Sequence, residues 1–287
     1  QPPRPLAYHA PGNVASIDDY NGHRTSLSHD VARNLEAVRV EGLSATQACL
    51  GPITPGGSLP AGSRKITTEW HPHWPVETRR AEPGRITTSV YNGQPDPFNG
   101  NAVASCAPPA AMLPNGLPIL VLCRRVEQAT TDADGSQGLV APLQGGIPGR
   151  ENRWTYNARG QVLTHDGPRT DVSDITSYAY YADATADHMP GDLQSVTNPA
   201  GHVTLYTIYD AEGRAKRSIA ASGVITDTSY TPRGWVSNVT ITAASAPPQT
   251  TSYTHEVDGQ NATVTLPDGT VLTYSYDAAR RLTGVTD

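Results

Sequence analysis

Apolar and polar residues alternate along most of this chain in short runs, and the runs end at turns rich in glycine, asparagine or aspartate. Side chains that alternate with a period of two lie on opposite faces of a β-strand, so each run predicts a strand. The clearest run begins after Gly201 and ends at Tyr209, and the residues Asp210 to Arg214 follow it. Aspartate and glycine suit a tight turn, because aspartate bonds to its own backbone and glycine adopts positive φ. The pattern therefore predicts a strand, a turn and the start of a second, antiparallel strand.

The same unit recurs at a regular spacing. Tyr209, Tyr230, His255 and Tyr276 end successive runs and stand 21, 25 and 21 residues apart. A fixed period of this length is typical of repeat proteins, in which one unit cannot bury a face alone and depends on its neighbours. We therefore expect an all-β fold, an array of antiparallel β-hairpin repeats that forms a curved or spiralling sheet. The anchors of the repeat are Gly201, Tyr209, Asp210, Gly213, Arg214, Gly223, Tyr230, Gly234, Gly269, Tyr276 and Asp277.

Weaker copies of the unit divide the chain into three parts. Degenerate repeats occupy 1–93, an insertion occupies 94–150, and the clearest repeat array occupies 151–287. Within the insertion, Asn115-Gly116 is the strongest two-residue hairpin signal, and it separates the apolar stretches 110–113 and 119–122. The insertion is thus expected to carry a hairpin of its own.

The composition indicates a thin sheet. Hydrophobic residues make up 37% of the chain and charged residues 17%, and 13 tyrosines accompany a single phenylalanine. This apolar content is below the globular norm and argues against a thick two-layer core. It suits a sheet with water on much of both faces, stabilised by contacts of Tyr and Thr across strands.

The net charge and the ends of the chain indicate which partners to expect. The net charge of −6 leaves no basic footprint, so nucleic acid is not an expected partner. No apolar run reaches the roughly 18 residues that a membrane-spanning helix needs. The chain starts at Gln1 and stops partway into a repeat at Asp287, so we expect it to be a piece of a longer parent chain. An open array leaves an unpaired strand at each end, which predicts self-association through the sheet edges.

Two of the three cysteines flank the predicted hairpin turn. Cys106 and Cys123 lie almost symmetrically about Asn115-Gly116, so a disulfide between them would staple the insertion and indicate an oxidising compartment. The alternative is that both are small buried hydrophobes. Cys49 is left over, either free or paired outside this chain.

The segment 70–75 combines two tryptophans, two histidines and two prolines. A metal site would need His71 and His73 on one strand face together with a third ligand, but the prolines favour a turn and no third ligand has a compatible spacing. Trp70 and Trp74 would alternatively stack on a glycan. The third interpretation is structural, because the segment falls where the Tyr-Asp turn falls in the other repeats. We expect no metal and no other cofactor.

The acidic residues Asp210, Glu212, Asp258 and Asp277 would suggest a glycosidase pair if two of them met in a cleft. They recur instead at the same point of successive units, which indicates turn residues. The sequence contains no Gly-x-Ser-x-Gly motif of the kind that carries a hydrolase nucleophile. We therefore predict that the chain is not an enzyme.

The motif Tyr209-Asp210-x-x-Gly213-Arg214, with Gly-x-x-Thr upstream, resembles the YD repeat of the bacterial RHS family. Near matches begin at Tyr156 and Tyr276, and the resemblance covers roughly residues 18–92 and 151–287. In that family, and in the related Tc-toxin shell components and animal teneurins, such repeats form a long sheet that spirals into a hollow shell. In bacteria the shell encloses a toxic C-terminal domain until delivery.

The resemblance implies a structural role for this chain. It would be a segment of an RHS/YD-repeat shell, part of a larger parent chain that encapsulates a toxin or other polypeptide cargo. Such a protein would be bacterial and exported by a secretion system, hence secreted or at the cell surface. The family's C-terminal plug region and a toxin domain are not recognisable in this sequence. The alternative is a cell-surface or carbohydrate-binding module built on YD repeats, with contacts from the aromatic residues outside the repeat phase, Trp74, Phe98 and Trp154.

Overall fold

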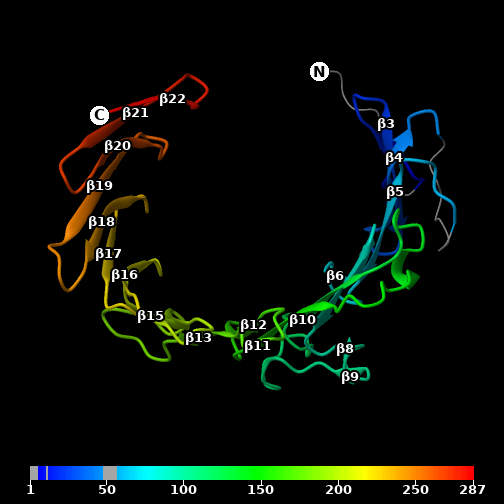
Figure 1. The fold of residues 1–287 in the computed structure, drawn as a ribbon, viewed down its shortest axis with the longest axis horizontal. Helices are drawn as coiled ribbons and strands as arrows, with labels where there is room; N and C mark the ends of the chain where they lie inside the picture. The colour runs from blue at the N-terminus through cyan, green and yellow to red at the C-terminus, as the bar shows by residue number, and fades with distance from the viewer. Residues whose placement is uncertain (1–5, 11, 48–56) are drawn as a thin grey trace. The chain divides into compact units, whose positions relative to one another are not determined.

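The computed structural model describes residues 6–10, 12–47 and 57–287 (Figure 1). The chain divides into two compact units, Gln1–Ser173 and Asp174–Asp287. Regular structure in the described residues is β throughout, apart from one 3₁₀ turn, η1 (Gly138–Val140). The predicted all-β array of antiparallel hairpins is therefore confirmed. No helix in the described part of the chain has the length and apolar character that a membrane crossing requires.

Unit 1 is one antiparallel sheet with a small additional ladder. Its strands are β1 (Leu6–Tyr8), β2 (Val14–Asp18), β3 (His23–Asp30), β4 (Leu35–Ser44), β5 (Arg64–Trp70), β6 (Glu77–Glu82), β7 (Arg85–Tyr91), β8 (Pro95–Asp96), β9 (Ala102–Val103), β10 (Leu122–Ala129), β11 (Arg150–Tyr156) and β12 (Val162–Asp166). From β1 to β7, each strand pairs with the next strand of the chain. β10 then pairs with β7, and β11 and β12 follow. β8 and β9 pair only with each other.

Unit 2 is a simpler array of hairpins. Its strands are β13 (Thr176–Tyr180), β14 (Leu193–Thr197), β15 (Val203–Tyr209), β16 (Ala215–Ile219), β17 (Ile225–Tyr230), β18 (Val236–Thr242), β19 (Gln249–His255), β20 (Asn261–Thr265), β21 (Val271–Tyr276) and β22 (Leu282–Thr286). Every strand pairs antiparallel with its neighbour in the sequence, so the order in the sheet follows the order in the chain. Figure 1 shows this succession as a ribbon that passes from yellow-green to red.

A register shift interrupts many hairpins immediately before the aromatic or histidine residue that ends the first strand. It precedes Trp70, Tyr156, Tyr209, Tyr230, His255 and Tyr276. A bulge of this kind inserts one residue and re-aims the side chain that follows. The extra residue lies near the start of the second strand, as Leu163 does between Val162 and Thr164. The alternation of apolar and polar residues did not reveal it, because a single added residue leaves the rest of the strand pattern intact.

The insertion predicted over 94–150 contributes to the main sheet. β10 lies within these residues, and it pairs with β7 on one side and β11 on the other. The Asn115-Gly116 turn forms, and the Leu113 amide donates to the Leu117 carbonyl oxygen at 2.7 Å. The strands expected around it do not form, since Met112 and Pro118 make only an isolated bridge. Pro118 has no N–H to donate, which prevents a longer ladder.

One buried cluster of unit 1 lies where the segment 132–141 packs on β5 and β6. Ala81 and Ile86 of the sheet form an apolar cluster with Ala141, and Leu139 packs against it. Lys65 of β5 is only 2% exposed beneath the same segment. Among the described residues, few other side chains are so well covered, in keeping with the low apolar content of the chain.

Unit 2 carries different side chains on its two faces. On one face threonine hydroxyls pair across strands, with 2.9 Å between Thr240 and Thr250 Oγ1 and 2.7 Å between Thr254 and Thr263 Oγ1. On the other, Tyr253, Val264 and Leu272 stand in register on three adjacent strands. Val264, at 7% exposed, is the one buried hydrophobic residue in unit 2, so water reaches much of both faces.

Candidate functional site

The tyrosine of each clear repeat bonds to the strand before it. The Tyr209 hydroxyl donates a hydrogen bond to the carbonyl oxygen of Leu193 at 2.6 Å. Leu193 is the first residue of β14. The same link joins Tyr230 to Ala215 at 3.0 Å and Tyr276 to Asn261 at 2.9 Å. In each case the acceptor is the first residue of the neighbouring strand. The links therefore fasten one repeat to the previous one at the same point of the sheet.

The degenerate repeats of unit 1 keep the same link with altered residues. Tyr91 donates to Glu77 O at 3.2 Å, and Tyr156 donates to Leu122 O at 2.8 Å. Trp70 takes the aromatic position of its repeat, and its indole N–H donates to Glu36 O at 2.8 Å. Trp70 thus performs the structural task of the repeat tyrosine.

The stability that the Tyr209 link contributes should depend on pH in alkaline solution. Burial, followed by the nearby Asp192 carboxylate, raises the pKa of Tyr209 from 10.0 to about 12. The folded chain therefore keeps this proton in a range where the unfolded chain loses it, so the stabilisation is complete below pH 10 and is lost as the pH rises towards 12.

We expect Tyr209→Phe to lower the free energy of unfolding by about 1 kcal/mol at pH 7, since it removes one hydrogen bond. Thermal unfolding at pH 7 and pH 11 should also show a smaller loss of stability at high pH than the unsubstituted chain. Tyr8→Phe is the control, because Tyr8 is 59% exposed. Equal alkaline losses in Tyr209→Phe and the unsubstituted chain would contradict the assignment.

The aspartate that follows the tyrosine closes its own turn. Asp210 Oδ1 accepts the amides of Glu212 at 3.1 Å and Arg214 at 3.0 Å, and Oδ2 accepts Arg214 Nε at 2.7 Å. Asp277 holds Ala279 and Arg281 in the same way. The amide of Arg281 and then its side chain lower the pKa of Asp277, against the effect of partial burial. These carboxylates therefore make their hydrogen bonds within their own turns.

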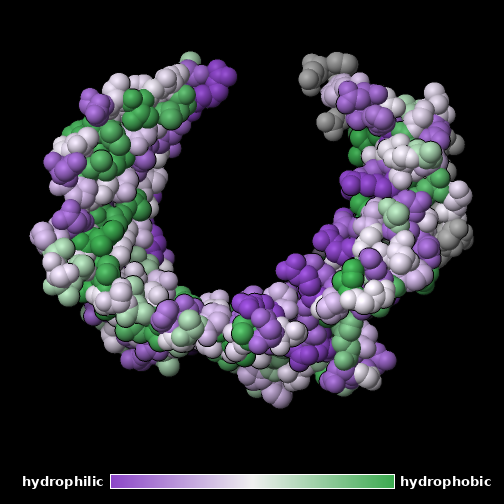
Figure 2. Space-filling view, in the orientation of Figure 1, coloured by the Kyte–Doolittle hydropathy of each residue, from purple (hydrophilic) through white to green (hydrophobic). Residues whose placement is uncertain are grey.

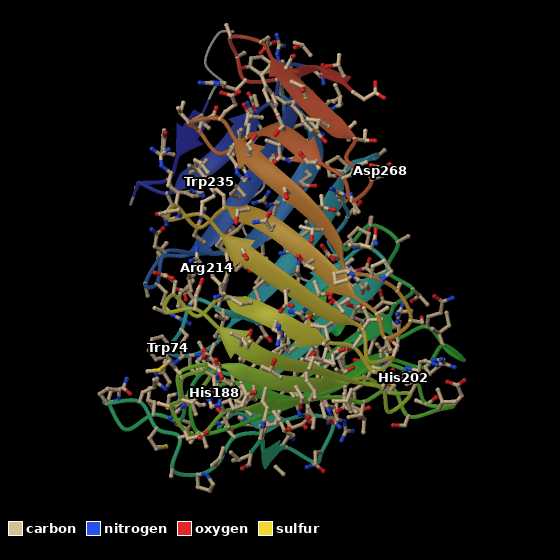
Figure 3. The ribbon with its side chains drawn as sticks, turned by 90° about the vertical axis from the view of Figure 1, so that its left-hand side faces the viewer. Trp74, His188, His202, Arg214, Trp235 and Asp268 are labelled. Carbon is tan, nitrogen blue, oxygen red and sulfur yellow. A yellow bond between two sulfur atoms is a disulfide. The ribbon has the colours of Figure 1, made fainter. Side chains whose placement is uncertain are left out.

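The turns also contact one another along the array. The Arg214 guanidinium lies 4.6 Å from the centre of the Tyr230 ring, in the next repeat. Trp235 lies so close to Gly259 of the following turn that a Cβ there would come within 2.9 Å of the indole. Figure 3 shows Arg214 and Trp235 along one rim of unit 2, with His202 and Asp268 along the other. The Tyr-Asp turns thus form one rim, and the turns at Gly201 and Gly269 form the opposite one.

The repeat glycines share one backbone conformation, and the space around Gly213 is open. Gly201, Gly213, Gly223, Gly234 and Gly269 all adopt positive φ. A Cβ on Gly213 would meet nothing closer than Asp192 Oδ1 at 4.0 Å. Arg280, which replaces this glycine in the last repeat, has φ +62°. The site therefore tolerates a side chain at the cost of backbone strain alone.

We expect Gly213→Arg to lower the free energy of unfolding by about 1 kcal/mol, through strain at positive φ. Gly213→Val should cost more, about 2 to 3 kcal/mol, because a β-branched residue resists this conformation. Chemical unfolding of the two variants measures the difference. Equal losses would show that contacts, rather than backbone strain, decide the outcome.

The residues of the segment 70–75 do not gather metal ligands. His71 is 3% exposed and meets the edge of the Tyr91 ring at 5.8 Å, and burial lowers its pKa, with His73 and Arg33 adding to the effect. His73 is exposed, and its amide donates to His71 Nδ1 at 3.2 Å. Within the described residues, no three His, Cys, Asp or Glu side chains are grouped to hold a metal ion.

Cys106 and Cys123 form a disulfide with a Cα–Cα distance of 5.4 Å. The bridge fastens the loop before the Asn115-Gly116 turn to the start of β10. The amide of Cys106 donates to Asn92 Oδ1, and its carbonyl oxygen accepts the amide of Tyr156 at 2.7 Å. The third cysteine, Cys49, lies outside the described residues.

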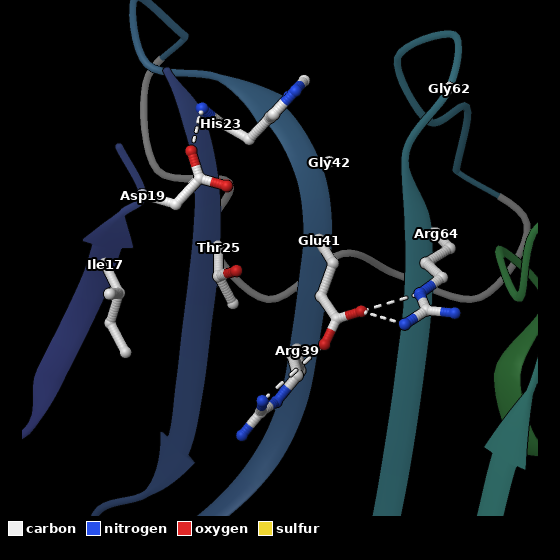
Figure 4. A pocket seen from close by; sticks show the side chains of 9 residues that line it. All are labelled: Ile17, Asp19, His23, Thr25, Arg39, Glu41, Gly42, Gly62 and Arg64. Atoms are coloured by element: carbon white, nitrogen blue, oxygen red, sulfur yellow. Dashed lines mark hydrogen bonds and ion pairs between the residues drawn. The ribbon is translucent and has the colours of Figure 1, made fainter. Parts of the chain in front are cut away.

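Hydrophilic residues gather along the concave side of unit 1 (Figure 2). A hollow of about 470 Å³ on β2 to β5 is lined by Asp19, His23, Arg39, Glu41 and Arg64, among others (Figure 4). Glu41 Oε2 lies 2.7 Å from Arg64, and Glu41 Oε1 lies 3.7 Å from Arg39. Arg39, Glu41 and Arg64 are therefore paired with one another in this hollow.

Comparison with known proteins places the repeat motif in a family. Residues 256–287 match the model of the RHS repeat. No protein of curated function matches the sequence. The match and the repeated Tyr-Asp turns confirm the predicted resemblance to the RHS/YD-repeat family.

Solved Tc-toxin structures share the fold. The crystal structure of TcdB2-TccC3 matches with a TM-score of 0.58 at 15% identity, over 99% of this chain and 14% of that chain. A complex named TcdB2-TccC3-TEV gives 0.59 at 16%, over 99% and 14%. A mutant Photorhabdus luminescens Tc holotoxin pore gives 0.58 at 15%, over 98% and 13%. This chain thus spans about one seventh of the length of the chains that it matches.

Proposed function

We propose that this chain is a structural segment of an RHS/YD-repeat shell that encloses a toxin or other polypeptide cargo. The observation that carries the proposal is the tyrosine link, which ties the repeats of Tyr209, Tyr230 and Tyr276 to the strand before each of them. An array built in this way extends by adding units and has no natural end of its own. The likeness to a small part of Tc-toxin chains supports the same role.

The mechanism of such a wall is steric. A continuous sheet separates the cargo from proteases and from the producing cell. Paired charges such as those of Glu41 and Arg64, and paired hydroxyls such as those of Thr254 and Thr263, offer few apolar contacts to an unfolded cargo. The partners would be the remainder of the parent chain and its cargo, and the protein would be secreted or at the cell surface of a bacterium. The wall itself would catalyse no reaction.

Limited proteolysis of the natural full-length protein tests this role. Segments enclosed by the shell should resist protease while the shell is intact and become sensitive once urea opens it. The same segments expressed without the shell are the control, and we expect them to be cut at once. Equal cleavage rates inside and outside the shell would exclude encapsulation.

The second candidate function is recognition of a surface glycan. The predicted Trp70 platform has its indole N–H bonded within the sheet, but two other out-of-phase aromatic residues, Phe98 and Trp154, line a common pocket.

Self-association through the open edge of β22 also remains a prediction, which light scattering of this chain would test.

A further inference from the structure

Consecutive Tyr-Asp turns of unit 2 fit together through one pair of positions. The residue that directly follows a turn glycine lies over the corresponding glycine of the next turn, and we call it the cover residue. A Cβ added to Gly234 would come within 2.6 Å of Arg214 Nη1. A Cβ added to Gly259 would come within 2.9 Å of the Trp235 indole. Both cover residues lie along the same rim of unit 2 (Figure 3).

The first of these cover residues, Arg214, is fixed in place over Gly234. Its Nε lies 2.7 Å from Asp210 Oδ2, and its Nη2 lies 3.0 Å from Glu212 Oε2. The guanidinium also lies 4.6 Å from the centre of the Tyr230 ring. A side chain at position 234 would have to displace the guanidinium from these contacts, which adds to the cost of the backbone conformation.

The Trp235 indole is held over Gly259 in a similar way. The Arg233 guanidinium lies 5.4 Å from the centre of the indole, and the centre of the His255 ring lies 5.2 Å from it. Arg233 Nη1 also donates a hydrogen bond to the Val257 carbonyl oxygen at 2.8 Å, within the turn that Trp235 covers. Because an indole is a rigid plane, a Cβ at position 259 would displace the whole ring from these neighbours.

Two other cover residues leave space over the next turn. Asp192, which covers Gly213, has a short side chain, and its Oδ1 stays 4.0 Å from the would-be Cβ. Gln260 donates a hydrogen bond from Nε2 to the carbonyl oxygen of Arg280 at 2.8 Å. Arg280 takes the place of the glycine in that turn, at φ +62°. A side chain is thus present where the cover residue bonds to the backbone, and glycine is present beneath the arginine and the tryptophan.

We propose that the cover residue selects the turn that can follow it, and so acts as the recognition element between successive repeats. Arg214 and Trp235 accept only a turn with glycine at the covered position, whereas Gln260 accepts a turn with a side chain there. Repeats of one array resemble one another, so a strand can pair with the wrong repeat, and a clash at this position makes such mispairing unfavourable. The inference goes beyond the proposed wall function and does not depend on it, because these contacts belong to unit 2 itself.

A double-mutant cycle in this chain tests the proposal, with urea unfolding as the measurement. Gly259→Ala should raise the unfolding equilibrium constant about a hundredfold in the unsubstituted chain, because the new Cβ meets the indole. In the Trp235→Ala background the same change should raise it only about fivefold, through backbone strain at φ +94°. Gly223→Ala is the control and should cost the same in both backgrounds, because Gly223 has φ +81° with nothing within 4 Å of its would-be Cβ.

The converse exchange gives a result that loss of packing alone would not produce. Gln260→Trp should raise the unfolding equilibrium constant at least about tenfold, because the new indole meets the Arg280 side chain. Arg280→Gly should then recover this loss, and its gain should exceed the roughly fivefold gain that release of strain gives in the presence of Gln260. A Gly259→Ala variant that fails to fold, while its combination with Trp235→Ala folds, supports the proposal equally. The proposal is overturned if the two substitutions of either pair act additively.

Discussion

Replacing Gly135 with alanine should lower the free energy of unfolding by about 4 kcal/mol, because the added Cβ meets the backbone of β5. Gly135 has φ +79°, and a Cβ on it would lie 2.0 Å from the carbonyl oxygen of Lys65. That oxygen belongs to the backbone of β5, a strand paired on both sides, so it cannot move aside. The segment 132–141 would have to lift away from the sheet.

The lifting would expose a buried charge. The Lys65 ammonium donates a hydrogen bond to the Ser136 carbonyl oxygen at 3.0 Å, and the Lys65 amide donates one to the Asp134 carbonyl oxygen at 2.8 Å. Gly146→Ala is the matched control, because Gly146 has φ +75° but nothing within 4 Å of its would-be Cβ. Urea unfolding should show a loss of about 1 kcal/mol for Gly146→Ala, from backbone strain alone. Equal losses for the two variants would mean that the 132–141 segment does not press on β5.

Removing the disulfide should produce the second-largest loss, about 3 kcal/mol, the value expected for a loop of this length. The bridge spans 17 positions in the sequence. The doubly substituted variant Cys106→Ser, Cys123→Ser should unfold at a lower temperature and should no longer respond to reductant. The chain with Cys49→Ser should respond to reductant as the unsubstituted chain does. An unchanged unfolding temperature on reduction would show that the ion pair of Arg124 and Asp96 holds this loop without the bridge.

The sequence predicts the repeats well because their signals are local. The turn at Asp210 is completed by Glu212 and Arg214, two and four positions away, so all residues of the motif are close together in the sequence. The tyrosine link reaches only to the neighbouring strand, 15 residues back in the case of Tyr230. Such short-range contacts leave a regular trace in the sequence.

The features that the sequence did not reveal depend on distant residues. Lys65 meets Ser136, 71 positions along the chain, and nothing near Lys65 indicates a buried lysine. β10 pairs with β7 across the β8–β9 excursion, so its pairing could not be read from a neighbouring turn. Phe98 and Trp154 stand out of phase in the sequence, but only the fold brings them to one pocket. Long-range pairing of this kind carries no local periodicity.

The central claim is that this chain is a wall segment of a larger shell, and the mass of the natural gene product tests it most directly. An antibody against residues 193–287 would isolate the natural protein for intact mass measurement. We expect a chain several times larger than the 30.5 kDa of these 287 residues. A natural chain of 30.5 kDa would contradict it, because so short a sheet is too small to enclose a polypeptide cargo.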